Sequence, residues 1–372
     1  MRRLVKKLRL DKADWIFFLV VMVICVLGLL NLYSATYDLS ISKYFRNQIL
    51  WMSAGLFISF ILSLMNYHLI LRTGYFWYGF TVFLLILVLF AGKSAGGSQR
   101  WISFGFFYLQ PSELAKIAIV IGLAKYFHSN HQKREMGLID LIIPMVILVI
   151  PCVLILKQPD LGTALVVFFT GCMMIWFVGI QRKILVVLML IGLVSIPLAW
   201  KFVLKPYQKD RVISFIQPEK YADSKGYQVI QSKIAVGSGR VVGKGYLKGS
   251  QSKLQFLPKQ HTDFVFSNYG EEFGFVGSFV LLMLYLTLGL MGLGIAVTSK
   301  DVFGIMLAFG LTATILIQTL INLGMELGLL PVVGMTLPFF SYGGTSLITS
   351  FLALGILMNL SMHRLIHAGH KA

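Results

Sequence analysis

Long apolar stretches recur along the chain, and their length predicts helices that cross a membrane. A helix needs about 20 mostly apolar residues to span the hydrocarbon core of a bilayer. Stretches of this kind lie at 14–34, 47–65, 75–91, 113–128, 138–156, 163–179, 184–203, 264–298, 302–324 and 342–362. The pattern predicts an all-α polytopic membrane protein, in which residues 1–372 form a single domain of ten transmembrane helices.

The stretch 264–298 is too long for one straight crossing. Its first part contains Glu271, Glu272 and several glycines. We interpret this part as a re-entrant or extramembrane helix that leads into the crossing. The two glutamates would either stabilise the helix start or pair with lysines of the preceding loop.

The composition agrees with a membrane protein. Hydrophobic residues make up 57% of the chain and charged residues 13%, whereas soluble domains carry roughly 25% charged residues. The first apolar stretch is longer than the core of a signal peptide and lacks a cleavage site, so we expect a retained helix. Cys25, Cys152 and Cys172 lie in apolar stretches without metal-ligand spacing, and we interpret them as buried thiols.

The net charge of +18 is unevenly divided between the two sides of the predicted membrane. The short loops on one side contain only Lys43, Arg46, Lys93, Arg100 and Lys157. The other side holds Arg2, Arg3, Lys6, Lys7, Arg9, Lys12, Arg72, Lys133, Arg134, Arg182, Lys183, Lys300, Arg364 and Lys371. Because cytoplasmic loops are enriched in Lys and Arg, we expect both termini in the cytoplasm.

The seventh and eighth stretches are joined by a large basic loop, residues 204–263, which this orientation places outside the membrane. Long loops cross the membrane largely regardless of charge. Loops of this length are usually functional or disordered. The periodic apolar residues of "YQVIQSKIAV" (227–236) predict a short amphipathic helix, which argues against disorder.

Ionisable residues gather at the outer start of the fourth stretch, in "QRWISFGFFYLQPSELAK". Glu113 and Lys116 would share one helix face, with Arg100 upstream and Ser112 as the helix N-cap. These residues have two explanations: they cap and neutralise the helix start, or they line a polar cavity. The second is a functional hypothesis, which the cost of placing charges at membrane depth favours.

The sixth stretch begins in a similar way. Asp160 follows Pro159 in "LKQPDLGTALV" and could be only an N-cap. Two helix starts of the form Gln-Pro-Ser/Asp on the same outer face suggest a shared polar chamber.

The last stretch is approached through a segment broken by proline and glycine, "LPVVGMTLPFFSYGGTS". Irregular backbone at membrane depth is tolerated where it lines a cavity or is buried in protein. Backbone N–H groups of Ser341, Tyr342, Gly343 and Gly344 could bind a phosphate at a helix N-terminus. The alternative is a re-entrant loop that merely packs.

Asp263 stands where the basic loop meets the membrane, in "PKQHTDFVF". It either caps a helix or acts as a general base beside a surface that attracts anions. His261 could assist, although a solvated loop histidine is the simpler interpretation, and its surroundings form no metal triad. Lys259 is a further candidate for binding an anionic substrate.

The common energy-coupling and hydrolase motifs are missing from the sequence. It contains no P-loop, dinucleotide fingerprint, G-x-S-x-G or H-E-x-x-H. A reaction here would therefore use a substrate that is already activated. We expect no nucleic-acid partner, and no organic cofactor is indicated.

Four segments together resemble the SEDS family of membrane glycosyltransferases in bacterial cell-wall synthesis. They are "GSQRWISFGFFYLQPSELAK", "KQPDLGTAL", the run from "GYQVIQSKIAVGSGR" to "PKQHTDFVF", and "LPVVGMTLPFFSYGGTS". Within the family, "GKGYLKGSQSKLQFLPKQHTDF" is more similar to the elongation members, RodA, than to the division members, FtsW. The resemblance covers nearly the whole chain, with Ser98 at a position where the family often has alanine.

The resemblance implies ten transmembrane helices with the large outer loop between the seventh and eighth. It implies polymerisation of lipid II into glycan strands on the outer face of the bacterial cytoplasmic membrane during cell elongation. The family's essential aspartate falls on Asp263, and other polar family positions fall on Arg100, Glu113, Lys116 and Asp160.

The resemblance also suggests a mechanism. Asp263 would deprotonate the 4-hydroxyl of the acceptor lipid II, which attacks the terminal sugar of the growing polyprenyl-linked strand and expels pyrophosphate. Cations would stabilise the leaving group, either side chains such as Lys116 and Arg100 or a bound divalent metal ion. The sequence leaves this choice open.

Two other functions remain as alternatives: a lipid II flippase, because broken helices and buried charges suit transport equally well, and a non-enzymatic scaffold of the cell-wall synthesis complex. The family also implies a partner, a class B penicillin-binding protein that supplies transpeptidation. Gly289, Gly292 and Gly294 could allow a partner helix to approach, or could serve packing within the chain.

Overall fold

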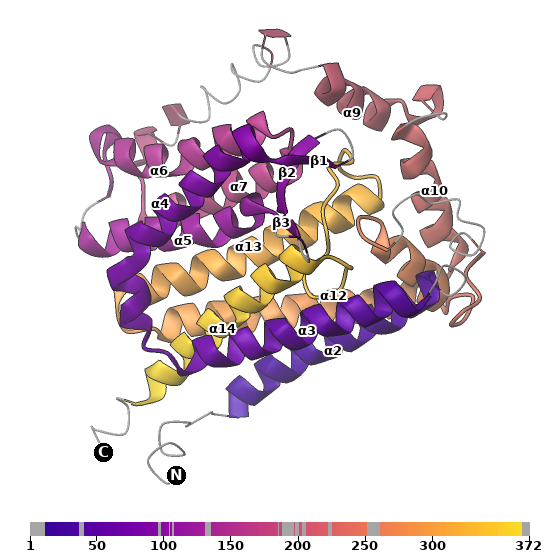
Figure 1. The fold of residues 1–372 in the computed structure, drawn as a ribbon, viewed down its shortest axis with the longest axis horizontal. Helices are drawn as coiled ribbons and strands as arrows, with labels where there is room; N and C mark the ends of the chain where they lie inside the picture. The colour runs from indigo at the N-terminus through magenta and orange to yellow at the C-terminus, as the bar shows by residue number, and fades with distance from the viewer. Residues whose placement is uncertain are drawn as a thin grey trace.

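The computed structural model describes residues 12–36, 41–95, 98–103, 105, 108–130, 135–184, 186–187, 197, 201–202, 206–221, 225–250 and 261–366. Within these ranges the protein is a bundle of long helices with a small sheet and a group of short helices at one end (Figure 1).

The long helices coincide with the apolar stretches of the sequence. They are α2 (Lys12–Ala35), α3 (Ile41–Leu64), α4 (Tyr67–Ala91), α5 (Pro111–Ser129), α6 (Leu138–Lys157), α7 (Leu161–Val178), α12 (Val265–Thr298), α13 (Val302–Glu326) and α14 (Gly344–Ile366). Among the described residues, eight of the helices are long and apolar enough to span a membrane. Helix α5, which carries Glu113, Lys116 and Lys125, is not among the eight. The predicted span 184–203 lies largely outside the described residues.

Helices α13 and α14 form the centre of the bundle. In its most apolar 18-residue window α13 is 83% buried and α14 78%, compared with 28% for α3 and α4. Helix α13 contacts α5, α7, α12 and α14, and α14 packs along α3 (Figure 1). Polar side chains on α13 are therefore enclosed by protein and not by lipid.

Helix α12 is interrupted in its N-terminal third. Gly274 has φ 65° and ψ −159°, a conformation that lies outside the helical region and favours glycine. The chain before α12 lies across this break: the amides of Phe275 and Val276 donate to the carbonyls of Arg240 and Val241. The prediction that 264–298 is not one straight helix is therefore confirmed.

The two glutamates before the break are buried. Glu271 forms an ion pair with Lys244 of the preceding loop at 2.6 Å and accepts hydrogen bonds from Ser250. The Glu272 carboxylate accepts a hydrogen bond from Ser34 of α2. The predicted pairing with loop lysines is confirmed for Glu271.

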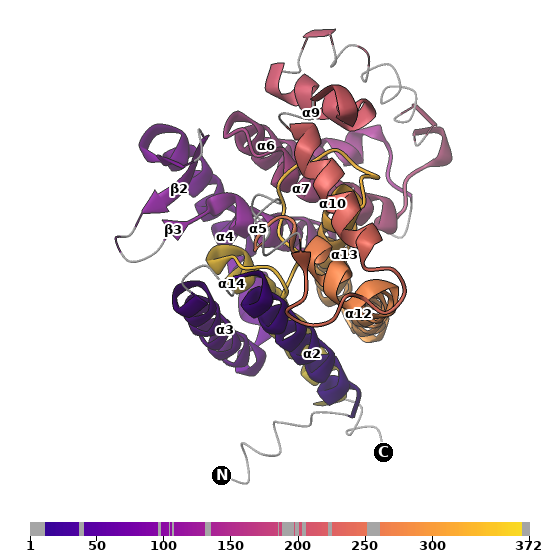
Figure 2. The ribbon, with the colours of Figure 1, turned by 90° about the vertical axis from the view of Figure 1, so that its right-hand side faces the viewer.

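Shorter elements lie on two flanks of the bundle (Figure 2). On one flank lie α9 (Pro206–Ile216), a 3₁₀ turn (Pro218–Tyr221) and α10 (Lys225–Ser238). Helix α10 confirms the helix predicted over 227–236. On the other flank is a three-stranded antiparallel sheet, β1 (Lys93–Ala95), β2 (Ser98–Ser103) and β3 (Tyr108–Leu109), which the apolar pattern did not predict.

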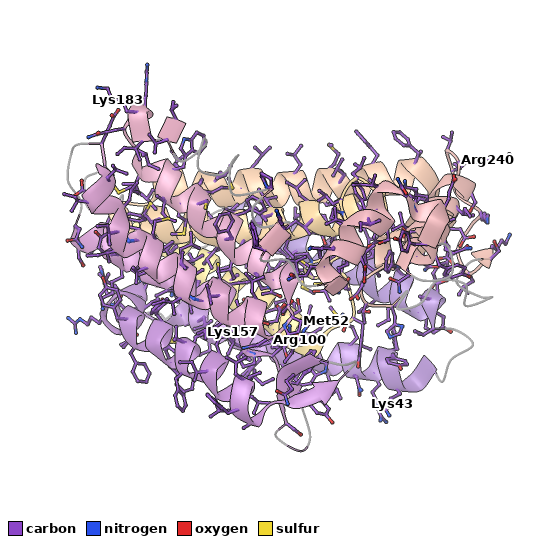
Figure 3. All side chains as sticks on the ribbon, turned by 90° about the horizontal axis from the view of Figure 1, so that it is seen from above. Lys43, Met52, Arg100, Lys157, Lys183 and Arg240 are labelled. Carbon is purple, nitrogen blue, oxygen red and sulfur yellow. The ribbon has the colours of Figure 1, made fainter. Side chains whose placement is uncertain are left out.

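Two lysines expected on opposite sides of the membrane lie apart in the structure. Lys183 is at one end of the molecule and Lys43 at the other (Figure 3). The first turn of α2 and the last turn of α14 lie near each other at the end away from α10 (Figure 1). This arrangement agrees with termini on the same side.

The glycines of α12 mainly serve packing inside the chain. A Cβ atom at Gly289 would lie 2.8 Å from the side chain of Leu316, and one at Gly292 would overlap Thr312. Both neighbours belong to α13, so these two glycines bring α12 and α13 together. Gly294 faces open space within the described structure.

Candidate active site

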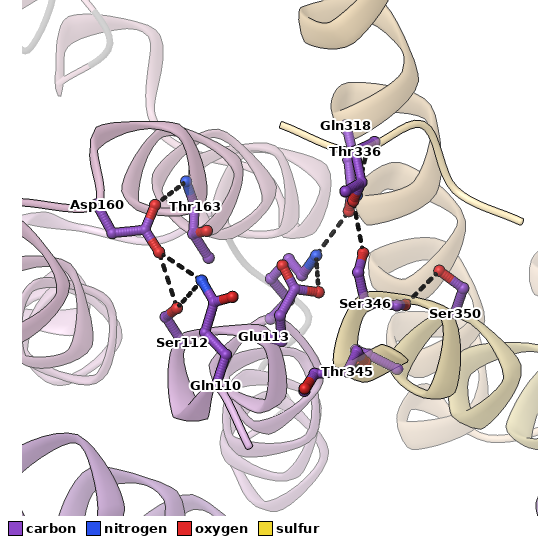
Figure 4. Close-up of polar contacts among 12 residues, drawn as sticks. Gln110, Ser112, Glu113, Asp160, Thr163, Gln318, Thr336, Thr345, Ser346 and Ser350 are labelled. Atoms are coloured by element: carbon purple, nitrogen blue, oxygen red, sulfur yellow. Dashed lines mark hydrogen bonds and ion pairs between the residues drawn. The ribbon is translucent and has the colours of Figure 1, made fainter. Parts of the chain in front are cut away.

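The two similar helix starts predicted from the sequence meet in the structure. Asp160 is the N-cap of α7 and accepts from the Thr163 amide at 3.4 Å. It also accepts hydrogen bonds from Ser112 and Gln110, each at 2.9 Å (Figure 4). The prediction that Ser112 is the N-cap of α5 is wrong, because the helix begins two residues earlier than that cap implies, at Pro111, with Gln110 at the cap.

Arg100 reaches the same place from strand β2. Its guanidinium donates to the carbonyls of Gln158 and Pro159 and lies 3.9 Å from the Asp160 carboxylate. The side chain is 22% exposed. Arg100 thus holds the turn between α6 and α7 and places the small sheet against the start of α7.

Glu113 and Lys116 form a buried ion pair at 2.7 Å, with 7% and 2% of their side chains exposed. Lys116 also donates to Gln318 Oε1 of α13 at 2.7 Å. Gln318 in turn donates to the Thr336 carbonyl at 2.8 Å, and the Thr336 hydroxyl contacts Ser346 of α14 at 2.7 Å. The pair connects α5 to both central helices.

We call these two neighbouring sets of contacts, which are joined through the backbone at the start of α5, the polar belt (Figure 4). It consists of Asp160, Ser112, Gln110, Glu113, Lys116, Gln318, Thr336 and Ser346. The belt runs from α7 across α5 to α13 and α14, in the part of the bundle that the sequence marked as unusually polar.

Asp263 is half-buried in the turn that leads into α12. Its carbonyl accepts a hydrogen bond from Asn322 of α13 at 3.2 Å, and the same amide group donates to Met335 at 2.6 Å. Asn322 lies four residues after Gln318, so the two side chains share one face of α13. Met335 likewise precedes Thr336 of the belt. Asp263 and the polar belt therefore border the same stretch of α13 and the same loop.

The loop before α14 also approaches the Asp263 carboxylate. Gly334 has φ 73°, and a Cβ atom there would lie 3.4 Å from Asp263 Oδ2. Gly334→Ala is expected to lower by about tenfold the rate of any reaction in which the Asp263 carboxylate takes part, since the left-handed backbone is strained for alanine and the loop would shift. The check is the turnover rate of purified Gly334→Ala compared with that of the wild type, in a variant whose substrate affinity is unchanged. An unchanged rate would show that the loop does not position Asp263.

Ser341 and Tyr342 use their backbone amides within the protein. The Ser341 amide donates to the Leu337 carbonyl at 3.0 Å, and its hydroxyl accepts from the Leu337 amide at 2.8 Å. The Tyr342 amide donates to the His261 carbonyl at 3.1 Å. For these two residues the structure supports packing and not the predicted phosphate site. Gly343 and Gly344 follow directly, with α14 beginning at Gly344.

His261 is not the solvated loop histidine expected from the sequence. It is half-buried, with its ring 4.9 Å from that of Tyr44 and 6.1 Å from that of Tyr342. Burial lowers the pKa of the imidazole, and the nearby Asp263 carboxylate opposes this shift. His261 thus joins the loop before α14 to the Asp263 turn.

A pH dependence of stability follows from this lowered pKa. Between the ordinary value of 6.5 and the lower folded-state value, the unfolded chain binds more protons, so stability falls as the pH decreases. His261→Phe should lose this contribution. Unfolding temperatures of the two proteins at about pH 7.5 and about pH 5.5 check it; an equal pH dependence in both would contradict the assignment.

Lys259 and possible metal ligands are the candidates that remain. Lys259 lies outside the described residues. Among residues 12–366 with their gaps, no group of three or more His, Cys, Asp or Glu side chains could hold a metal ion. The cations identified at the site are Arg100 and Lys116.

Sequence reasoning missed three members of the belt and the residue that holds the Asp263 carbonyl. They are Gln318 and Asn322 of α13, and Thr336 and Ser346 beside them. A signal for the first two was present, because amides four residues apart in an apolar stretch are costly at membrane depth. Nothing in the sequence alone indicated that Thr336 and Ser346 face them.

Known proteins are similar to this chain in both sequence and fold. The profile of the FtsW/RodA/SpoVE cell cycle proteins matches residues 14–366. The chain is 40% identical over 283 residues to the peptidoglycan glycosyltransferase MrdB of Escherichia coli K12, covering 76% of each chain. It is 34% identical over 365 residues to a probable peptidoglycan glycosyltransferase FtsW of Geobacter metallireducens, covering 95% of each.

Two solved structures agree with this relationship. One, described as a peptidoglycan synthase complex that coordinates polymerization and crosslinking, contains a chain with a TM-score of 0.82 and 31% identity, over 96% of this chain and 99% of that one. The rod shape determining protein RodA of Thermus thermophilus gives a TM-score of 0.71 and 30% identity, over 96% and 98%. The chain belongs to the FtsW/RodA/SpoVE family, the SEDS proteins.

Proposed function

We propose that this protein is a peptidoglycan glycosyltransferase, which polymerises lipid II into glycan strands on the outer face of the cytoplasmic membrane during cell elongation. The observation that carries the proposal is the position of Asp263. The residue is half-buried, and it borders the helix and the loop that hold the buried Glu113–Lys116 pair. The names of the relatives supply the reaction class.

The proposed reaction transfers the growing strand onto a new lipid II. Asp263 accepts the proton of the acceptor's 4-hydroxyl group, and that oxygen forms a bond to C1 of the strand's terminal sugar. The bond from C1 to the polyprenyl pyrophosphate breaks, and the pyrophosphate leaves with the electron pair. The configuration at C1 inverts. No nucleotide is consumed, because the donor is already activated.

The polar belt is proposed to hold the charged groups of the substrate site in fixed positions. Lys116 is held by Glu113 and Gln318, and Arg100 by the turn around Pro159. Fixed groups of this kind stabilise developing charge without reorganising. We therefore propose that Arg100 and Lys116 provide positive potential for the diphosphate, while Glu113 and Asp160 hold the two cations in place.

The protein is proposed to be integral to the cytoplasmic membrane with both termini in the cytoplasm and the large loop outside. The charge distribution over the loops supports this orientation. A class B penicillin-binding protein is the proposed partner, supported by the similarity to a chain of a synthase complex. Such a partner would crosslink the strands that this protein makes.

A polymerisation assay in detergent tests the function. Purified protein with its transpeptidase partner is expected to convert labelled lipid II into long glycan strands in the absence of a bilayer. A flippase would need two leaflets and would form no strands. A scaffold would require another polymerase in the mixture. Failure of the pure pair to form strands would therefore contradict the proposal.

A further inference from the structure

Glu326 is a buried carboxyl group to which the proposed reaction gives no role. It is the last residue of α13 and has 0% of its surface exposed. Burying an ionisable group is costly unless it is well hydrogen-bonded. A negative charge at the C-terminus of its own helix is also unfavourable. Packing of α13 alone therefore does not account for a glutamate here.

The partners of Glu326 lie at the start of another helix. Oε1 accepts from the Phe266 amide at 3.2 Å, and Oε2 accepts from the Ser267 amide at 2.6 Å and the Ser267 hydroxyl at 2.8 Å. The first amides of a helix have no partner within the helix. The N-cap of α12 is Phe264, whose side chain cannot accept a hydrogen bond. Glu326 supplies the missing cap from outside.

The amides that Glu326 caps follow closely after Asp263 in the chain. Asn322, one turn earlier on α13, holds the Asp263 carbonyl at 3.2 Å. Glu326 holds the amides of the third and fourth residues after Asp263. The two side chains of α13 thus fix the backbone at the Asp263 carbonyl and over the residues that follow it.

A third helix strengthens the same junction. Ser232 of α10 lies 2.6 Å from the Ser267 hydroxyl and donates to the backbone carbonyl of Glu326. Ser232 and Ser267 are both fully buried. Helices α10, α12 and α13 therefore meet at Glu326, one turn from Asp263.

We infer that Glu326 is a positioning residue for Asp263: by capping α12 it holds the turn from which the Asp263 carboxylate reaches the substrate. The inference rests on the proposed function, in which Asp263 is the general base. Glu326 itself is enclosed and touches no substrate. Its removal should affect turnover more than substrate binding.

The test compares Glu326→Leu and Glu326→Gln in lipid II polymerisation, with rates given per folded molecule from size-exclusion chromatography. Glutamine keeps one acceptor oxygen, but its NH₂ group would face one of the amide donors. Leucine keeps none. Since a misplacement of about 1 Å can cost about 10²-fold in rate, kcat should fall about 10- to 100-fold for leucine and less for glutamine, with KM changed by less than about threefold.

A matched control is Glu272→Gln, which alters a buried carboxyl group on α12 itself, nine residues after Asp263 in the chain. It should lower thermal stability as Glu326→Gln does but leave kcat within about twofold of wild type. Amide hydrogen exchange should rise over 264–268 in the Glu326 variants and not in Glu272→Gln.

A wild-type kcat per folded molecule in both Glu326 variants would overturn the inference. So would an equal loss in Glu272→Gln, because the effect would then come from general loosening of α12. Failure of the proposed function has a different result: Asp263→Asn would polymerise lipid II like the wild type, whatever the Glu326 variants do.

Discussion

Replacing Asp263 with asparagine is expected to lower kcat for glycan strand formation by about 10²–10⁴-fold, the usual contribution of a general base. Asparagine keeps the size of the side chain but cannot accept the proton of the attacking hydroxyl. The backbone contacts of this residue, through Asn322 to its carbonyl, do not involve the carboxylate. The fold should therefore survive the change.

The measurement is the initial rate of polymerisation of labelled lipid II by purified Asp263→Asn with its partner. Thermal unfolding in the same detergent serves as the folding control, and it should lie close to the wild-type temperature. Binding of lipid II should be retained. If Asp263→Asn does not fold, Asp263→Ala takes its place. A wild-type rate in either folded variant would rule out Asp263 as the general base.

Replacing Glu113 with alanine is expected to destabilise the protein by about 3–5 kcal/mol, because it leaves a buried lysine without its counter-ion. Lys116 is 2% exposed, and it also donates a hydrogen bond to the neutral Gln318. The loss should appear as a lower unfolding temperature in detergent. Activity should fall as well, since Gln318 and Thr336 link Lys116 to the loop beside Asp263.

The double variant Glu113→Leu with Lys116→Met provides the control. Replacing a buried ion pair with apolar residues of similar volume is often neutral for stability, so much of the lost stability should return. Activity should not return, because the double variant lacks the Lys116 cation. A Glu113→Ala protein that unfolds at the wild-type temperature would show that Lys116 is not buried as an ion pair.

The sequence predicted the helical architecture well, for a simple physical reason. A bilayer requires about 20 apolar residues per crossing, and stretches such as 302–324 and 342–362 coincide with α13 and α14. The break in α12 was also predictable, from its excess length and its acidic start. The pairing of Glu271 with a loop lysine followed from the scarcity of acidic residues near so many basic ones.

The sequence could not predict which polar groups meet across helices. Ser112 was expected to cap α5 but instead donates to Asp160 of α7. His261 was expected in solvent but lies between Tyr44 and Tyr342. Such contacts depend on how helices far apart in the chain are rotated and packed, which local pattern does not encode. The short strands around Arg100 had no apolar alternation long enough to detect.

The role of Glu326 illustrates the same limit. In the sequence it is one acidic residue at the end of an apolar stretch. Its two amide partners, Phe266 and Ser267, come from a helix about sixty positions earlier. The contact becomes visible only when α12 and α13 are placed side by side.

Chemical rescue of Asp263→Ala tests the central claim most directly. Small carboxylates such as formate can enter the space left by the missing side chain and accept the proton in its place. The account predicts that Asp263→Ala forms almost no glycan strands alone, and that the rate rises in proportion to added formate. The Glu113→Ala variant should not respond. Strand formation by Asp263→Ala at the wild-type rate, without formate, would contradict the account.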